Sequence, residues 1–254
     1  MMKRRAFIGG LALAAAANAG PVGLRLPKPA SGGGSSFVPG DIAGMQLWLD
    51  ASQIVGLNDG DPVTDWPDSS GNGYDYAQAT GSKQPTYKTN IRVGGTLPVV
   101  RLDGVDDSMT GAHVITVKTE VVVFDITGTP PQFATVAGLR VVGNVNTIYR
   151  DTSNTRLGTY QGGAGFGPAL SGVGTGFLVV INRFDATTNK LRIDGVDASP
   201  VAGVWNTSWI SGEIGYLFGV GLQYFSGDVA HRICYNTMIS DADCANMENY
   251  FATH

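Results

Sequence analysis

The chain has 254 residues, of which 43% are hydrophobic and 15% are charged, and its formal net charge is −4. A chain of this length and apolar content can bury a sizeable core. Lys and Arg form no run beyond Arg5, which argues against nucleic acid as a partner because phosphate binding needs clustered positive charge. The 36 glycines, together with frequent Thr, Val and Asn, favour an all-β protein with many turns.

Residues 1–19 differ in character from the rest of the chain. Basic residues at Lys3 to Arg5 precede an apolar stretch, and Ala17-Asn18-Ala19 ends it in the A-x-A form of a secretory signal peptide. The alternative is an apolar arm that stays attached and packs against a neighbour in an assembly. Residues 20–40 are rich in Pro, Gly and Ser and predict a linker, so we expect the globular domain at 41–254.

The body of the chain predicts short strands joined by Gly-, Asn- and Asp-rich turns. Many short strands without helical crossovers indicate a β-sandwich or barrel, and we favour a two-sheet antiparallel sandwich. One helix is expected near the C-terminus, with Ser240 as its cap and Asp243 three residues on. The Gly-rich stretch 161–176 is expected to be a flexible loop without a ligand. The strands are expected at 45–50, 98–102, 114–117, 120–126, 138–142, 147–149, 177–184, 190–193, 215–218 and 228–235.

Two octapeptides are nearly identical: RLDGVDDS at 101–108 and RIDGVDAS at 192–199. In each copy an Asp-Gly pair stands between short β-type runs, where Gly accepts a positive φ and Asp bonds to nearby backbone. Both copies therefore predict tight turns. The alternative is a metal or sugar site that uses the Asp side chains of these turns, namely Asp103, Asp106, Asp194 and Asp197.

Several stretches resemble a concanavalin A-like, laminin-G-like jelly roll. They are LWLDASQI (47–54), DGDPVTDWPDSSGNGYDYAQAT (59–80), QPTYKTN (84–90), VVRLDGVDDSM (99–109) and YFSGDVAHRICYNTMISDADCANMENYFA (224–252). The resemblance covers roughly residues 41–254 and implies two packed antiparallel sheets of about six or seven strands each. Domains of this family are found in bacterial surface proteins and bacteriophage structural proteins, and they usually bind or build. Members of this family often have an acidic residue at the position of His231, so this residue departs from the family pattern.

The sequence carries no pattern typical of an enzyme. Glycosidases need two carboxylates across the scissile bond, and the E-x-D-x-x-E motif of one concanavalin A-like branch is absent. The three Glu residues, at 120, 213 and 248, are far apart in the sequence. H-E-x-x-H, G-x-S-x-G and P-loop motifs are also absent. We therefore predict a protein that is not an enzyme.

Two sets of residues are candidates for binding. Asp59, Asp61, Asp65 and Asp68 form an Asp-rich stretch that suggests a calcium site, because hard cations prefer several oxygen ligands. The alternative is a polar surface loop with Asx turns, in which case no cofactor is expected. The aromatic residues Tyr74, Tyr76, Trp205 and Trp209 are candidates for stacking on sugars or anchoring a partner. Cys234 and Cys244 allow one disulfide or two thiols.

Three functions follow from these patterns. The first is a virion structural or decoration protein, exposed at the virion surface and attached to other virion proteins through its N-terminal arm. The second is a secreted bacterial carbohydrate-binding or adhesion protein, exported through its signal peptide, with cell-surface glycans as partners. The third and least favoured is a glycoside hydrolase. A homo-oligomer is compatible with each of them.

Overall fold

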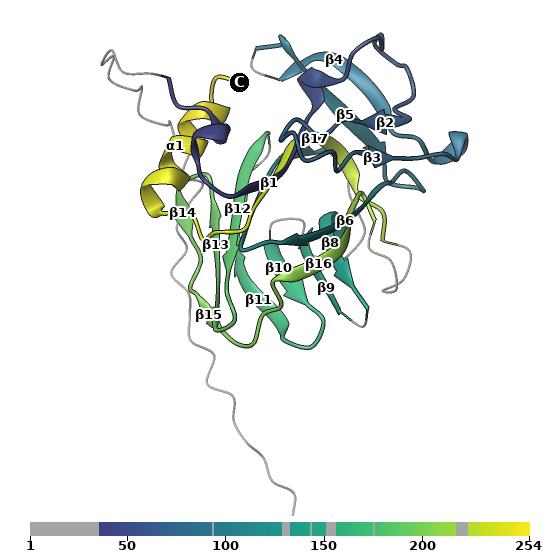
Figure 1. Ribbon diagram of the computed structural model, residues 1–254. Coiled ribbons are helices and arrows are strands. Elements are labelled where there is room, and N and C mark those ends of the chain that lie inside the picture. Colours follow the sequence, from purple (N-terminus) through teal and green to yellow (C-terminus); the bar gives the residue numbers. More distant parts are fainter. Residues whose placement is uncertain are drawn as a thin grey trace, which may run out of the picture. The chain divides into compact units, whose positions relative to one another are not determined.

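The computed structural model describes residues 36–92, 94–128, 133–142, 144–150, 156–174, 176–216 and 223–254. The predicted arm at 1–19 and most of the predicted linker lie outside the described residues. The described chain forms two antiparallel β-sheets and one α-helix (Figure 1). This confirms the expected all-β, two-sheet sandwich.

Sheet A contains nine strands. They are β1 (Met45–Asp50), β4 (Thr86–Arg92), β5 (Leu97–Asp103), β7 (Thr119–Ile126), β12 (Leu178–Phe184), β13 (Thr188–Ile193), β14 (Val196–Asp197), β15 (Val201–Ala202) and β17 (Ser226–Tyr235). Their hydrogen-bonded order is β14-β13-β12-β7-β17-β5-β4, with β1 paired to β17 and β15 paired to β13. The long strand β17 therefore lies near the centre of the sheet.

Sheet B contains eight strands in the order β11-β10-β9-β8-β16-β6-β3-β2. They are β2 (Asp65–Trp66), β3 (Tyr76–Ala77), β6 (Met109–Thr116), β8 (Ala134–Val141), β9 (Asn144–Arg150), β10 (Leu157–Gln161), β11 (Gly165–Leu170) and β16 (Ser208–Ile214). Both sheets thus have more strands than the resemblance implied. Three short 3₁₀ helices, η1 (Pro39–Asp41), η2 (Ala51–Gln53) and η3 (Gly81–Lys83), lie in the connections.

The sequence placed one element wrongly. Part of the stretch 161–176 is the strand β11 rather than a loop, and it pairs with β10 alone among the described strands. Of the strand expected at 215–218, residues 217 and 218 lie outside the described residues. The described strand β16 ends at Ile214, and Gly215 takes a φ of 82° that breaks the extended backbone. Within the predicted linker, the ring of Phe37 packs on Tyr250 at a centroid distance of 6.3 Å.

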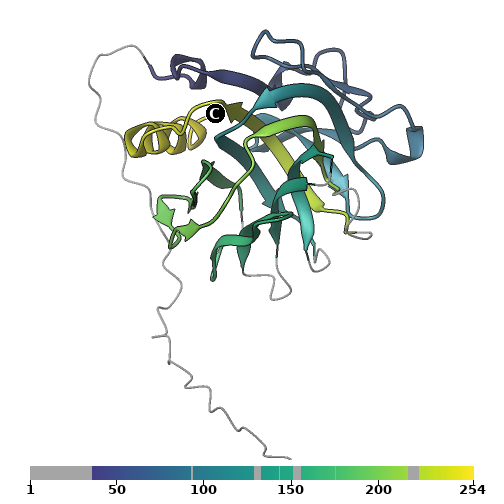
Figure 2. The same cartoon turned by 60° about the horizontal axis from the view of Figure 1, so that its bottom comes forward.

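The main core lies between the sheets. Strand β6 alternates strictly between buried and exposed residues, so Met109 and Ile115 face the core while Val114 is 80% exposed. Strand β12 is buried at every position, as predicted for a strand covered on both faces. Figures 1 and 2 show the reason: α1 (Asp241–Phe251) lies to one side of the strands, next to β12, β13 and β14.

Helix α1 closes the outer face of sheet A. Ser240 caps it, and its hydroxyl and the Asp243 carboxylate form a reciprocal capping box, as the sequence predicted. Met247 and Cys244 are buried in a second apolar cluster with residues of sheet A. Cys234 faces the other way, into the core between the sheets, so the two cysteines are free thiols. No helix in the described part of the chain is long and apolar enough to span a bilayer.

A buried arginine links the two sheets. Arg232 of β17 is completely buried, and its guanidinium contacts the Glu120 carboxylate of β7 at 2.7 Å. The same guanidinium reaches across the core to sheet B. It donates to the Tyr76 hydroxyl at 2.9 Å and to the carbonyls of Gly138 at 2.7 Å and Glu213 at 3.0 Å. One side chain therefore connects two strands of sheet A with three strands of sheet B.

The two octapeptides do the same structural job twice. The leading Arg of each copy forms an ion pair with a residue near the end of the chain. Arg101 binds Asp228 at 2.6 and 2.7 Å, and Arg192 binds Glu248 at 2.9 and 3.2 Å.

Both Asp-Gly pairs occupy turns with a positive φ at Gly, as predicted. Gly104 has a φ of 79° and Gly195 a φ of 82°. In the second copy Asp194 also has a positive φ, 46°, which is the pattern of a type I′ hairpin turn. In the first copy the Asp103 carboxylate instead accepts the backbone N–H of Val105 at 2.8 Å. The turns therefore differ in detail although their sequences are nearly the same.

Replacing Gly104 with Ala should destabilise the fold more than replacing Gly195 with Ala. The positive φ costs any L-residue about 1–2 kcal/mol at either position. A Cβ on Gly104 would also lie 2.8 Å from the Ser226 Cβ, whereas a Cβ on Gly195 meets nothing closer than 3.8 Å. Urea denaturation of the two variants measures the difference, and equal or reversed losses would contradict this account.

Removing the charge of Glu120 should cost about 3–5 kcal/mol of the free energy of unfolding, because Arg232 is then a buried charge without its counterion. The matched control is Asp59→Asn. Its carboxylate pairs at 2.7 Å with Lys88 and its side chain is 50% exposed, so this change should cost far less than Glu120→Gln. Chemical denaturation of Glu120→Gln and Asp59→Asn checks the difference. A loss below about 1 kcal/mol for Glu120→Gln would show that the pair does not hold the sheets together.

Candidate functional site

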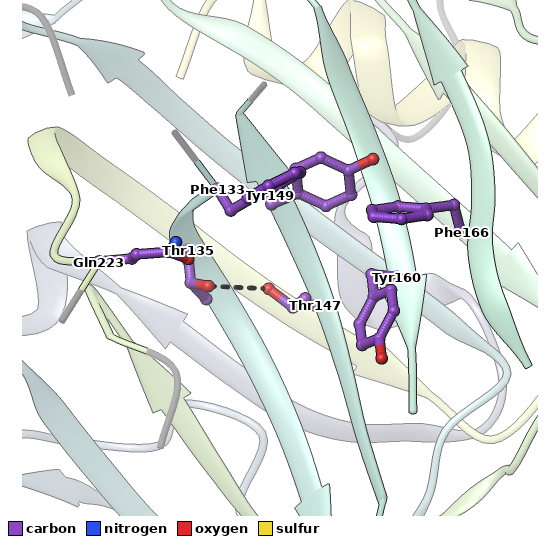
Figure 3. A pocket seen from close by; sticks show the side chains of 7 residues that line it. All are labelled: Phe133, Thr135, Thr147, Tyr149, Tyr160, Phe166 and Gln223. Carbon is purple, nitrogen blue, oxygen red and sulfur yellow. Dashed lines mark hydrogen bonds between the residues drawn. The ribbon is translucent and has the colours of Figure 1, made fainter. Parts of the chain in front are cut away.

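A pocket of about 270 Å³ lies on the outer face of sheet B, over β8, β9, β10 and β11 (Figure 3). Strand alternation places it there. Ile148 points into the core between the sheets, so Thr147 and Tyr149 on either side of it point outward. In β10, Leu157 faces the core and Tyr160 the outer face. The residues that line the pocket are Phe133, Thr135, Thr147, Tyr149, Tyr160, Phe166 and Gln223.

Four aromatic rings form the wall of this pocket. Phe166 is the centre of the group, with ring centroids 5.2 Å from Tyr160, 5.8 Å from Tyr149 and 5.9 Å from Phe133. Tyr160 and Phe166 are direct cross-strand partners in the β10–β11 pair, and such aromatic pairs stabilise a sheet. Phe166 is nevertheless 58% exposed. An exposed ring that is held in place by other rings offers a rigid flat face to a ligand.

The backbone makes room for these rings at two positions. Phe133 has a φ of 60°, an uncommon conformation for a bulky residue that costs about 1–3 kcal/mol. Its ring lies 5.4 Å from that of Tyr149. A Cβ on Gly158 would lie 3.0 Å from the Tyr149 hydroxyl and 2.9 Å from the Ala169 Cβ. Glycine at 158 therefore lets the Tyr149 ring lie across β10.

The polar atoms of the pocket are neutral. The Thr147 hydroxyl lies 3.2 Å from both the Thr135 hydroxyl and the Ala137 carbonyl oxygen, and it can donate a hydrogen bond to either. Gln223 is tied to β8, because its carbonyl accepts the backbone N–H of Thr135 at 3.4 Å. The hydroxyl of Tyr160 and the amide of Gln223 add donors and acceptors. The seven described residues of the lining include no charged side chain, so they can bind through ring faces and hydrogen bonds.

The aromatic residues expected to bind do not form this site. Tyr76, Trp205 and Trp209 are buried in the core, at 0–2% exposure, so their ring faces are not available to a ligand in solvent. Tyr74 is half-buried and packs against His113 at 5.6 Å. Core packing is the physical reason, because Trp209 pairs with Ile115 in the middle of sheet B.

The Asp-rich stretch is not gathered into one site. The carboxylate of Asp59 pairs with Lys88 at 2.7 Å, and that of Asp61 accepts the backbone N–H of Asn58 at 2.7 Å. Asp68 accepts the backbone N–H groups of Trp48 and Ser70, each at 2.9 Å, and Asp65 is exposed on β2. These bonds are those of the polar loop with Asx turns that the sequence offered as the alternative. Calcium binding by this stretch stays a prediction.

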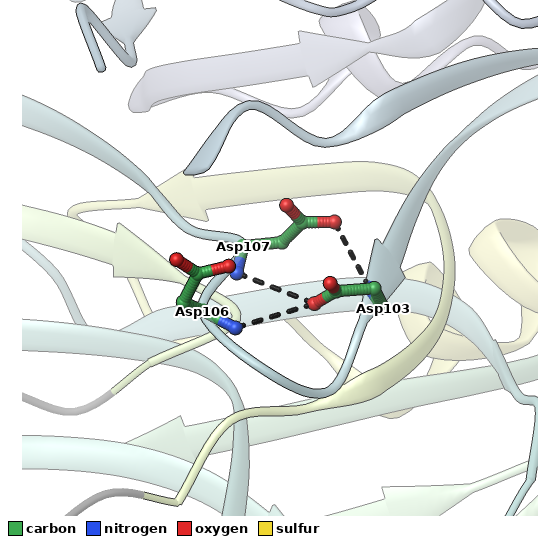
Figure 4. A group of neighbouring side chains, drawn as sticks. All are labelled: Asp103, Asp106 and Asp107. Carbon is green, nitrogen blue, oxygen red and sulfur yellow. Dashed lines mark hydrogen bonds between the residues drawn. The ribbon is translucent and has the colours of Figure 1, made fainter. Parts of the chain in front are cut away.

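A different acidic group is found in the first octapeptide. Ligand atoms of Asp103, Asp106 and Asp107 lie within 4.8 Å of one another (Figure 4). Their hydrogen bonds explain the arrangement, because the Asp103 carboxylate accepts the backbone N–H groups of Asp106 and Asp107 at 3.3 and 3.4 Å. Asp107 in turn accepts the N–H of Asp103 at 3.0 Å. The group therefore stabilises the turn.

The second octapeptide uses its acidic residues in the same way. Asp194 accepts the backbone N–H of Val179 at 2.8 Å, and Asp197 pairs with Arg192 at 2.8 Å. Neither belongs to the acidic group around Asp103. The structure does not combine the two turns into the paired metal or sugar site that the sequence left open.

The three glutamates each have an arginine partner. Glu120 lies 2.7 Å from Arg232, Glu213 lies 3.8 Å from Arg140, and Glu248 lies 2.9 Å from Arg192. They are distributed over β7, β16 and α1.

Comparison with known proteins gives structural neighbours alone. No protein-family model matches the sequence, and no curated protein matches it. Domain 4 of AbnA, a GH43 extracellular arabinanase from Geobacillus stearothermophilus solved in complex with arabinotriose, is 13% identical with a TM-score of 0.57. That match covers 83% of this chain and 98% of the domain.

Two enzymes share the fold over part of their length. Trypanosoma rangeli sialidase, solved with the inhibitor DANA, is 14% identical with a TM-score of 0.55, over 80% of this chain and 32% of the sialidase. An arabinofuranosidase complexed with arabinofuranosyl-alpha-1,2-xylobiose is 12% identical with a TM-score of 0.54, over 76% of this chain and 51% of that one. At these identities the likeness establishes a shared fold.

These matches contradict the virion decoration function that we expected from the sequence. The similar structures belong to carbohydrate-active proteins rather than to virion components. The strand and turn patterns that suggested a virion protein are those of a β-sandwich in general, and this architecture serves many unrelated functions.

The carboxyl group of Asp107 should titrate near pH 6. Burial, reinforced by the charge of Asp103, raises the pKa of Asp107 to about 6. The folded state then holds the proton more tightly than the unfolded state, so this group's contribution to stability is largest below about pH 4 and is lost as pH rises through 6. Relative to Asp107→Asn, the wild-type protein should therefore lose stability between pH 4 and 7. Denaturation of both proteins across this range measures the change, and parallel pH profiles would contradict it.

Proposed function

We propose that this chain is a non-catalytic carbohydrate-binding domain with a concanavalin A-like sandwich, and that the aromatic pocket on sheet B is its binding site. One observation carries the proposal: four packed rings and several neutral hydrogen-bonding groups converge on one cavity, to which the described residues contribute no carboxylate. Ligand pockets typically combine apolar and aromatic walls with a few placed polar groups.

The chemistry of the pocket suits a sugar. A sugar ring presents C–H groups on its faces and hydroxyls around its edge. Tyr160 and Phe166 offer ring faces for the C–H side, as exposed aromatic rings do for flat apolar ligands. The amide of Gln223 and the Tyr160 hydroxyl can each donate and accept, which is what sugar hydroxyls require. The positive φ of Phe133 supports a functional role, because such strain is concentrated at binding sites.

The structural neighbours support a carbohydrate ligand in a weaker way. The arabinanase domain, which this chain matches over 98% of the domain's length, was solved with arabinotriose bound. That complex is a precedent for sugar binding by a domain of this size and fold. Because the chain matches 32% of the sialidase and 51% of the arabinofuranosidase, the activities of those whole enzymes are not carried over.

Binding without turnover is favoured over hydrolysis. Glycoside hydrolysis uses two carboxylates about 5–10 Å apart on either side of the bond. The described part of the pocket lining includes none, and Glu120, Glu213 and Glu248 are paired with arginines. We further propose that the protein acts outside the cell on surface glycans. The support for this location is the A-x-A pattern that ends at residue 19.

Affinity electrophoresis of the purified chain in gels that contain soluble polysaccharides tests the function. Phe166→Ala and Tyr160→Ala should each weaken binding about tenfold or more, because each removes a ring face from the contact. Val114→Ala is the matched control: it removes an 80% exposed apolar side chain from another strand of sheet B and should change nothing. Mobility that no polysaccharide retards, or retardation that survives both ring substitutions, would refute the proposal. Release of reducing sugar in the same assays would instead show an enzyme.

A further inference from the structure

We infer that the pocket holds a single uncharged sugar ring at the end or branch of a glycan, and excludes acidic sugars. This inference rests on the proposed function and specifies the ligand of the same site. Three properties of the pocket carry it: its volume, its lack of charge and the arrangement of its walls.

The volume fits one ring. A cavity of 150 Å³ holds benzene, which corresponds to roughly 25 Å³ for each heavy atom. On this scale the 270 Å³ of the pocket holds roughly 11 heavy atoms. A pentose has about ten heavy atoms and a hexose about twelve, so the pocket takes one of them and has no room for a second.

The lining excludes a buried anion. None of the seven lining residues is Lys, Arg or His, so a carboxylate in the pocket would lose its hydration without gaining a counterion. The π faces of Tyr149, Tyr160 and Phe166 carry negative electrostatic potential, which adds repulsion. A neutral sugar avoids both costs, because its hydroxyls can form hydrogen bonds with the Gln223 amide and the Tyr160 hydroxyl.

The walls favour entry by a chain end. Figure 3 shows side chains around the cavity, with Gln223 and Thr135 on one side and Phe166 and Tyr160 on the other. Thr135 and Thr147 are buried, and their hydroxyls bond to each other at 3.2 Å. A glycan chain that ran from one of these two sides to the other would be blocked by their side chains. A terminal or branching ring has a single connection, which can leave beside the Phe166 ring, which is 58% exposed.

Calorimetric titration with matched sugars tests this inference. The probes are arabinose, xylose and galactose, each as mono-, di- and trisaccharide, together with the galacturonic acid series, which differs from the galactose series by its carboxylates. For the neutral series that binds, we expect affinities within about threefold across the three lengths. Galacturonic acid should bind at least tenfold more weakly than galactose wherever galactose binds.

A gain-of-charge variant gives a second reading. Gln223→Lys places a cation at the half-buried edge of the pocket without removing a ring. It should raise the affinity for galacturonic acid relative to galactose at least fivefold, and Gln223→Met is the matched control of similar length without charge. Unchanged selectivity in Gln223→Lys would contradict the argument from charge.

The outcomes separate this inference from the proposed function. Suppose that affinity rises tenfold or more from mono- to trisaccharide, or that acidic sugars bind as well as neutral ones, while Phe166→Ala still weakens binding about tenfold or more. The site is then a glycan site of another kind, and this inference is overturned while the proposed function stands. The proposed function fails if none of the neutral sugars, the galacturonic acid series or the polysaccharides binds. It also fails if Phe166→Ala and Tyr160→Ala leave binding unchanged.

Discussion

The buried guanidinium of Arg232 is the constraint on which the sandwich depends. A charge in an apolar core is tolerated when a counterion and hydrogen-bond acceptors surround it, and here these come from Glu120 in sheet A and three strands of sheet B. Any slip of β8 or β16 would remove acceptors from that charge. Because side chains alternate along a strand, fixing the Gly138 carbonyl of β8 also fixes which residues of sheet B face outward. The pocket is thus a consequence of the core on the opposite side of the same strands.

The outer faces of the two sheets differ in what lies on them. Sheet A is closed by α1, which is held by charges as well as by apolar packing. Glu248 accepts from Arg192 at 2.9 Å and from the Gly195 N–H at 2.7 Å, so the second octapeptide anchors the helix. Arg92 donates to the carbonyls of Phe251 and His254, where a cation also complements the negative end of the helix dipole. With one face closed, the outer face of sheet B is where the structure places its aromatic pocket.

The sequence predicted well where local chemistry decides the structure. The bounds of β1, the fully buried strand β12, the Ser240 cap and both Asp-Gly turns follow from periodicity, capping and turn chemistry. The pocket could not be foreseen, because β11 contains Gly165, Gly167 and Pro168 and looks like a loop. An edge strand tolerates Pro, since one side of its backbone needs no partner. The exposure of Phe166 and the burial of Trp209 are likewise set by strand register, which depends on partners distant in the sequence.

The positions of the three glutamates support the proposal that the protein binds a ligand without catalysis. Glycoside hydrolysis uses two carboxylates that reach the bond between two sugars. Glu213 and Glu248 contact arginines, and Glu120 is enclosed in the core with Arg232. A carboxylate placed in the aromatic pocket would be desolvated beside π faces without a counterion from the described lining residues. The ion pairs thus hold the sheets and the helix together, and the described residues of the pocket are neutral, which supports the proposal that its ligand is uncharged.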